Sequence, residues 1–287
     1  MATPPEPGAR HVLPDQAPVP WVVIHLPHAS REIPADLRQT FLVDDAALER
    51  ELDRMTDHYT DALFALAGTA IASVRFPVSR LVVDPERFED DAREPMAQRG
   101  QGVVYTLTSH GEPLRHLPTP REREALLDRF YRTHHARLTE RVAAALAAHG
   151  IALIVDAHSF PDQPLPMELD QRPDRPDICI GTDPFHTPAA LVERLVAACD
   201  ALGWSVQVDA PYAGAMVPGR FFHREPRVQS VLIEVNRRLY VDDGARGVRP
   251  AAGFTAVRER VQRLVRAAVE AVEDRKNPAR SPARLTD

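Results

Sequence analysis

The sequence contains only two cysteines, Cys179 and Cys199, among its 287 residues. So few thiols argue against a disulfide framework and fit a reducing compartment, so we expect a cytoplasmic protein. No apolar run approaches the ~18 residues of a membrane span, and the first 20 residues lack the apolar core of a signal peptide. Lysine and arginine are scattered and the formal net charge is −6, so neither a membrane nor a nucleic acid is an expected partner.

What is present is typical of one globular domain. Hydrophobic residues make up 44% of the chain and charged residues 26%, which is ordinary for a protein with a sizeable buried core. Residues 1–20 are rich in proline and small residues and predict a flexible arm, and residues 276–287 predict a disordered tail. We therefore expect a single catalytic α/β domain over residues 21–275.

Strand-like and helix-like segments alternate along this domain. The predicted strands are residues 21–26, 70–76, 151–156, 205–209 and 230–235. The predicted helices are residues 45–66, 120–149, 188–202 and 253–273. The polar segments 88–119 and 161–177 are expected to be loops. Apolar strands separated by helices predict a mixed, mostly parallel sheet that is flanked by helices on both faces.

Three polar residues lie where predicted strands end. His28 follows the first strand, His158 follows the third, and Glu234 ends the last. Open α/β sheets place their sites at these ends. Two imidazoles and a carboxylate suit a catalytic zinc hydrolase, in which the histidines bind the metal and the carboxylate acts as general base. Taken singly, each histidine fits a structural hydrogen bond as well, and Glu234 fits a buried arginine partner.

Five short segments carry motifs in a fixed order along the chain. They are HLPHASREIP at 25–34, TDHYTDALF at 56–64, SRLVVDPER at 79–87, DAHS at 156–159 and SVLIEVNRRLY at 230–240. Together they resemble the N-formylglutamate amidohydrolase family, over about residues 21–270. That family is distantly similar to the zinc carboxypeptidases, which implies the same mixed sheet, with His158 as a metal ligand and Glu234 as the general base.

The resemblance implies a reaction, the hydrolysis of N-formyl-L-glutamate to formate and glutamate at the end of a histidine-degradation route. A divalent metal, expected to be zinc, would polarise the formyl oxygen and lower the pKa of its water from 15.7 toward about 7. Glu234 would take a proton from that water and pass it to the leaving amine.

The third metal ligand is open between two carboxylates. Asp57 matches an aspartate of the family and is preferred. Glu32 follows His28 by four residues, whereas the corresponding carboxylate of the carboxypeptidases follows by three. Asp156 shares a strand face with His158 and is expected either to orient that ring or to pair with an arginine. His25, three residues before His28, is an alternative ligand, but because it lies inside the first strand it is expected to pack.

A small acidic N-acylated amino acid needs fixed positive charge in its pocket, and arginine binds carboxylates in a bidentate way. The residues expected to bind substrate are Arg80, Asp84, Arg87, His135 and Arg237. The alternative is that these arginines pair with Asp84 or Asp57 and only brace loops.

Two other functions remain open from the sequence. One is a carboxypeptidase-like or other N-acyl-amino-acid hydrolase with the same site and a different pocket, and the other is a non-catalytic binding protein with the same fold. The metal, the acyl group and the oligomeric state are not fixed by the sequence.

Overall fold

A six-stranded sheet carries the fold, with its strands in the order β2-β1-β3-β6-β4-β5. The strands are β1 (Val22–Leu26), β2 (Ile71–Arg75), β3 (Ala152–Phe160), β4 (Ile178–Gly181), β5 (Val206–Val208) and β6 (Val228–Asn236). The first four in the order run parallel, whereas β4 is antiparallel to β6 and parallel to β5. This confirms the expected mixed, mostly parallel sheet, to which β4 adds a strand that was not predicted.

The computed structural model describes residues 18–68, 70–242 and 247–276. Most of the predicted arm and nearly all of the predicted tail, residues 1–17 and 277–287, lie outside the described residues. Within the described part, no helix is both long enough and apolar enough to cross a membrane.

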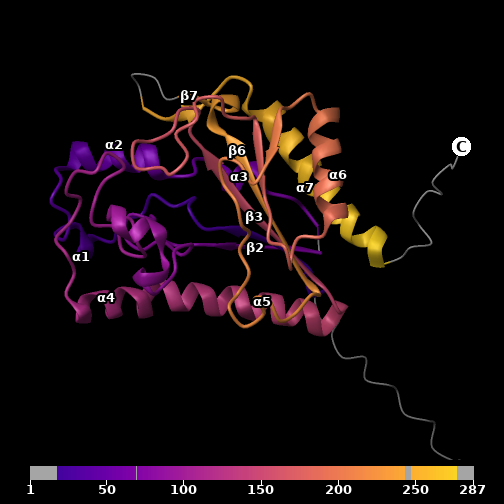
Figure 1. Cartoon of the computed structure of the whole chain (residues 1–287), viewed down its shortest axis with the longest axis horizontal. Coiled ribbons are helices and arrows are strands. Elements are labelled where there is room, and N and C mark those ends of the chain that lie inside the picture. The colour runs from indigo at the N-terminus through magenta and orange to yellow at the C-terminus, as the bar shows by residue number, and fades with distance from the viewer. Residues whose placement is uncertain (1–17, 69, 243–246, 277–287) are drawn as a thin grey trace, which may run out of the picture.

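Helices cover both faces of the sheet. They are α1 (Ala35–Arg38), α2 (Asp45–Met55), α3 (Thr60–Leu63), α4 (Pro120–Leu126), α5 (Thr133–His149), α6 (Ala189–Ala201) and α7 (Phe254–Lys276). Figure 1 shows α6 and α7 side by side on one side of the strands and α5 on the other. Short 3-10 turns η1 (Asp91–Arg93), η2 (Pro95–Arg99) and η4 (Arg237–Leu239) and a small hairpin of β7 (Val241–Asp242) and β8 (Arg249–Pro250) complete the description.

The main hydrophobic cluster surrounds the two central strands. All nine residues of β3 and all nine of β6 are buried, as expected of parallel strands covered on both faces. Leu138 and Val142 of α5 and Leu264 of α7 pack into this cluster. The polar residues of β3 and β6 therefore lie in a mostly apolar setting, where each needs a partner.

A second hydrophobic cluster lies beyond the sheet and comes from residues 33–131, with Leu165. Its buried members include Leu48 and Leu52 of α2, Leu81, Tyr105 and Leu127. The expectation that segment 88–119 is loop rather than core is therefore partly wrong. The segment has little regular structure, yet several of its apolar side chains are fully buried, and they lack the periodicity that marks a core element in a sequence.

The predicted helix over residues 45–66 is wrong as a single element. Helix α2 ends at Met55, Thr56 takes an extended conformation, and Tyr59 has a positive φ of 60° before α3 begins. Within this break the backbone N–H of Asp57 donates to the carbonyl of His28 at 3.0 Å. The interruption thus brings Asp57 next to the loop that follows β1.

The predicted helix over residues 120–149 is a continuous run with a widened middle. Helix α4 starts with a capping box between Thr119 and Glu122 and with Pro120 in its first turn. Residues Leu127–Arg132 form a π-helical segment, η3, and α5 continues to Gly150, whose positive φ of 68° ends the helix.

The fold predicts a large difference between two leucine substitutions. Leu153 on β3 is fully buried, whereas Leu117 is 83% exposed. We expect Leu153→Ala to lower the free energy of unfolding by about 2–5 kcal/mol, because it leaves a cavity in the main cluster. Leu117→Ala should change it by less than about 0.5 kcal/mol. Urea unfolding of both variants measures this, and equal losses would show that β3 is not the centre of the core.

Candidate metal centre

The register of β3 and β6 places His158 directly beside Glu234. These two residues are partners across the parallel pair, so their side chains leave the same face of the sheet, and neighbouring strands are about 4.8 Å apart. His158 lies inside β3, which continues to Phe160, and not after its end as the sequence suggested. Both side chains are buried, at 4% and 7% exposure.

His28 and Asp57 reach His158 from outside the sheet. His28 lies in the loop after β1, and Asp57 lies in the break between α2 and α3. Oδ2 of Asp57 is 3.2 Å from Nδ1 of His158 and 3.6 Å from Nδ1 of His28, and the two imidazole rings meet edge to face at 5.0 Å. One ligand atom from each of these three residues lies within 4.8 Å of the other two.

The facing atoms of this group fit a divalent cation. Nδ1 of His28 and Oδ2 of Asp57 are buried and have no hydrogen-bond partner among the described residues. Unpaired buried polar atoms are costly unless something binds them. Two imidazole nitrogens and one carboxylate oxygen are a donor set that zinc accepts, and that other first-row metals accept as well.

Both imidazole rings are held from behind by carboxylates. Nε2 of His28 is 2.8 Å from Oδ1 of Asp84. Nε2 of His158 is 2.9 Å from Oε2 of Glu86 and 3.2 Å from Oδ1 of Asp156. Ionised carboxylates only accept hydrogen bonds, so each Nε2 carries a proton, and in the neutral ring Nδ1 is left with a free lone pair. This tautomer is the one that a metal ligand at Nδ1 requires.

The charges around the centre favour a cation. Burial opposes ionisation of Asp57, yet the neighbouring imidazoles of His158 and His28 hold the pKa of its carboxyl well below the usual range. Burial likewise disfavours the charged form of His158, but Glu86 and Asp156 raise the pKa of this imidazole well above its usual value. A site that attracts a proton to the buried His158 also attracts a metal ion, which can replace that proton.

Glu234 differs from the other carboxyl groups of the centre. Burial raises its pKa to about 8, against the opposing charge of His158, and its Oε2 has no hydrogen-bond partner within the described residues. A buried carboxyl group whose pKa lies near neutrality and which stands beside a candidate metal site is typical of a general acid–base group. A nearby cation would lower this pKa again.

The arginines expected to bind substrate all contact acidic residues of the centre. Arg80 donates to Oδ2 of Asp84 through Nε and Nη2, at 3.1 and 2.7 Å. Nη2 of Arg237 donates to Oδ1 of Asp57 at 3.1 Å. Nε of Arg87 donates to the carbonyl of Gln101 and lies 3.8 Å from Asp84. The bracing contacts named as the alternative are therefore present.

Two further residues complete the account of the expected site. Asp84 is fully buried, and its carboxylate accepts hydrogen bonds from His28, Arg80, Tyr105 and the backbone of Glu86. His135 is half-buried on α5, and its Nε2 donates to the carbonyl of Pro85 at 2.9 Å, beside the loop of Asp84. The structure brings both residues to the same side of the centre as Arg80.

Glu32 is not part of the group. Its side chain is exposed, and the described cluster contains Asp57 instead. The residue that the sequence analysis missed is Glu86, which contacts His158. Glu86 lies within the motif at 79–87, two residues after Asp84, but nothing in the sequence indicates that it contacts His158.

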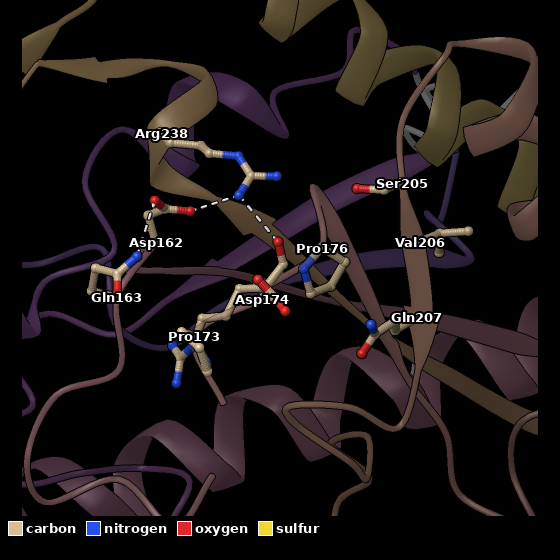
Figure 2. A pocket seen from close by; sticks show the side chains of 10 residues that line it. Asp162, Gln163, Pro173, Asp174, Pro176, Ser205, Val206, Gln207 and Arg238 are labelled. Atoms are coloured by element: carbon tan, nitrogen blue, oxygen red, sulfur yellow. Dashed lines mark hydrogen bonds and ion pairs between the residues drawn. The ribbon is translucent and has the colours of Figure 1, made fainter. Parts of the chain in front are cut away.

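A separate surface hollow lies away from this centre. It has a volume of about 470 Å³ and is lined by residues of loop 161–177, by β5 and by Arg238. Figure 2 shows Arg238 across its rim, where Nη1 donates to Asp162 and to the carbonyl of Arg175. None of the residues expected at the site lines the hollow, so it is not the candidate centre.

Known proteins resemble this chain over most of its length. The N-formylglutamate deformylase of Pseudomonas putida is 26% identical over 231 residues, which cover 77% of this chain and 82% of that protein. The N-formylglutamate deformylase of Pseudomonas aeruginosa is 27% identical over 230 residues, covering 78% and 83%.

Solved structures share the fold. The N-formylglutamate amidohydrolase of Ralstonia eutropha JMP134 superposes with a TM-score of 0.76 at 24% identity, covering 92% of this chain and 97% of that one. A gene product of Agrobacterium tumefaciens superposes with a TM-score of 0.64 at 17% identity, covering 91% and 94%.

The match to a family model includes every segment that builds the candidate centre. The model of N-formylglutamate amidohydrolases extends over residues 20–241, from just before β1 to beyond the end of β6. The motif segments that suggested the resemblance all lie inside this range. The chain belongs to the N-formylglutamate amidohydrolase family.

Proposed function

We propose that this protein hydrolyses the amide bond of N-formyl-L-glutamate, releasing formate and glutamate, at a metal centre formed by His28, Asp57 and His158. The observation that carries the proposal is the meeting of ligand atoms from His28, Asp57 and His158 beside the buried carboxyl group of Glu234; those of His28 and Asp57 have no hydrogen-bond partner among the described residues. The names of the two Pseudomonas relatives support the substrate. The reducing cytoplasm and a role in histidine breakdown are part of the same proposal.

The residues of the chain prepare the centre for the cation. Asp84 orients His28, and Asp156 and Glu86 orient His158, so that both Nδ1 atoms face Asp57. Arg237 donates to Oδ1 of Asp57, the oxygen other than the Oδ2 that faces the two histidines. A bound divalent cation, which we propose to be zinc, supplies a Lewis acid for the formyl carbonyl and lowers the pKa of water.

Glu234 moves the proton in the proposed reaction. Its carboxylate accepts a proton as the water oxygen bonds to the formyl carbon, and it then donates that proton to the nitrogen as the carbon–nitrogen bond breaks. Burial and the neighbouring charges place its pKa near the range in which both transfers are efficient.

Arg80 and Arg87 supply positive charge for the substrate carboxylates. Both lie against Tyr105: the guanidinium of Arg80 is 5.8 Å from the centre of its ring, and Nη2 of Arg87 reaches its hydroxyl. Their side chains are 15% and 21% exposed, so each is partly accessible to solvent. We assign Asp84 to hold these arginines and His28. We propose that His135 and Arg237 border the substrate at the same site.

Two matched carboxyl-to-amide substitutions test the third ligand. Asp57→Asn should weaken Zn²⁺ binding by more than ~100-fold, because it removes a ligand and not merely a residue that orients one. Glu32→Gln should leave binding unchanged, because Glu32 is exposed. Metal content after dialysis and competition with a chromophoric chelator measure both. Equal affinity in the two variants would remove Asp57 from the centre.

Glu234→Gln tests the proton transfer. This variant should retain its metal and release formate from N-formyl-L-glutamate at least ~100-fold more slowly, because the general base is lost. The matched control is Glu193→Gln on α6, which is exposed and should keep full turnover. A Glu234→Gln protein with near-normal turnover would exclude the proposed role.

Substrate charge tests the two arginines. N-formyl-L-glutamine, which lacks the side-chain carboxylate, should react with a kcat/KM about 10–150-fold lower than N-formyl-L-glutamate, the loss of one charged hydrogen bond. Arg80→Gln or Arg87→Gln should reduce the ratio of kcat/KM between these two substrates, whereas the control Arg123→Gln should leave it unchanged. An unchanged ratio in both variants would show that neither arginine binds that carboxylate. N-formyl-aspartate, acetylated amino acids and short peptides complete the panel and test the alternative hydrolases.

A further inference from the structure

A buried chain of hydrogen bonds extends behind His158 and includes two histidines that the proposed reaction does not use. Nε2 of His158 is 3.2 Å from Oδ1 of Asp156, the same oxygen is 2.7 Å from Nδ1 of His25, and Nε2 of His25 is 2.8 Å from Nε2 of His134. His25 is fully buried and His134 is 1% exposed. This series of hydrogen bonds therefore connects α5 to the candidate metal ligand His158 through buried side chains.

The proton positions along this series of hydrogen bonds can be assigned by starting from Asp156. Asp156, when ionised, only accepts, so Nδ1 of His25 donates to it. In a neutral His25 ring, Nε2 is then an acceptor, and Nε2 of His134 must donate to it. Nδ1 of His134 is left without a proton. This agrees with the observation that Nδ1 of His134 is buried and has no hydrogen-bond partner within the described residues.

The opposite assignment is unfavourable. A doubly protonated His25 would donate to Nε2 of His134, and the remaining proton of His134 would lie on Nδ1. That would leave a buried donor with no acceptor, which is rare in folded proteins. Burial also lowers the pKa of His134 to about 2, so this ring is neutral.

The widened helix brings His134 into line with His25. The buried residues Phe130, His134, Leu138 and Val142 follow one another at intervals of four. Each such interval drifts by roughly 40° around an ideal α-helix of 3.6 residues per turn. The π-helical segment Leu127–Arg132 turns less per residue and offsets part of this drift. Phe130 packs in the second hydrophobic cluster and Leu138 in the first, and His134 faces the sheet between them.

The other oxygen of Asp156 is fixed as well. Oδ2 accepts the backbone N–H of Met216 at 3.0 Å, in the loop that leads to β6. Asp156 thus has three donors: His158, His25 and this backbone group. His158 also contacts Glu86 and Asp57, whereas His25 is held on its far side by His134.

We propose that His25 and His134 are positioning residues for the metal centre: they fix the orientation of Asp156, and through it the ring of His158 with its Nδ1 toward the cation. The inference rests on the proposed function only in naming a metal as the ligand. It assigns His25 to a role beyond the packing expected from the sequence.

Metal affinity tests the proposal with two substitutions at one position. His134→Leu removes the donor, and the Zn²⁺ dissociation constant should rise on the order of tenfold, the lower end of what residues that orient a ligating histidine contribute. His134→Gln keeps an N–H near the position of Nε2 and should restore most of that affinity. The control His149→Leu removes an exposed histidine from the same helix and should bind Zn²⁺ normally. Equal affinities for the leucine and glutamine variants would overturn the proposal.

Nitrogen NMR of the wild-type protein gives an independent test that needs no variant to fold. The imidazole ¹⁵N shifts should show His134 protonated at Nε2 only and His25 protonated at Nδ1 only, both without metal and with Zn²⁺ bound. A His25 ring with no proton on Nδ1 would overturn the proposal. A wild-type protein that shows the expected tautomers but binds no Zn²⁺ would instead contradict the proposed function.

Discussion

The ring of each candidate metal-binding histidine is fixed by a carboxylate behind it, and the rest of the site depends on this constraint. Asp84 accepts from His28, and Asp156 and Glu86 accept from His158. The register of the central strands supplies the geometry, because His25 pairs with Asp156 and His158 with Glu234 on one face of adjoining parallel strands. Polar side chains placed so deeply in an apolar sheet are tolerated only because they satisfy one another.

The centre lies where two hydrophobic clusters meet. His158, Asp156 and Glu234 belong to strands packed in the first cluster, whereas Asp57 and Asp84 belong to segments that pack in the second. Each cluster holds its own share of the site rigidly, and the site is complete only when the two are docked. This division places the candidate ligands and Glu234 on segments packed in different clusters.

Sequence reasoning recovered the sheet and the family because those depend on local patterns. Apolar strands and ordered motifs can be read residue by residue, so the positions of His28, His158 and Glu234 at the carboxyl edge of the sheet were accessible. Two contacts could not be predicted from the sequence: that of Glu86 with His158, and that of His25 with His134. They depend on how the loop after β2 and the helix α5 fold back onto the sheet. The break at Thr56 could not be predicted either, because the helical pattern of the sequence continues across it. The break becomes understandable only from the hydrogen bond between Asp57 and His28. Whether the substrate contacts Asp84, His135 and the arginines remains a prediction.

The widened segment Leu127–Arg132 also constrains how the gene for this protein can change. The segment already accommodates about one residue more than an α-helix that turns equally far, and each further residue turns a helix by about 100°, so an inserted codon would rotate all of α5 relative to α4. His134 would then swing away from His25, and Leu138 and Val142 would leave the core together with it. The packing of α5 therefore depends more on the number of residues in the middle of this helical run than on the identity of its exposed side chains.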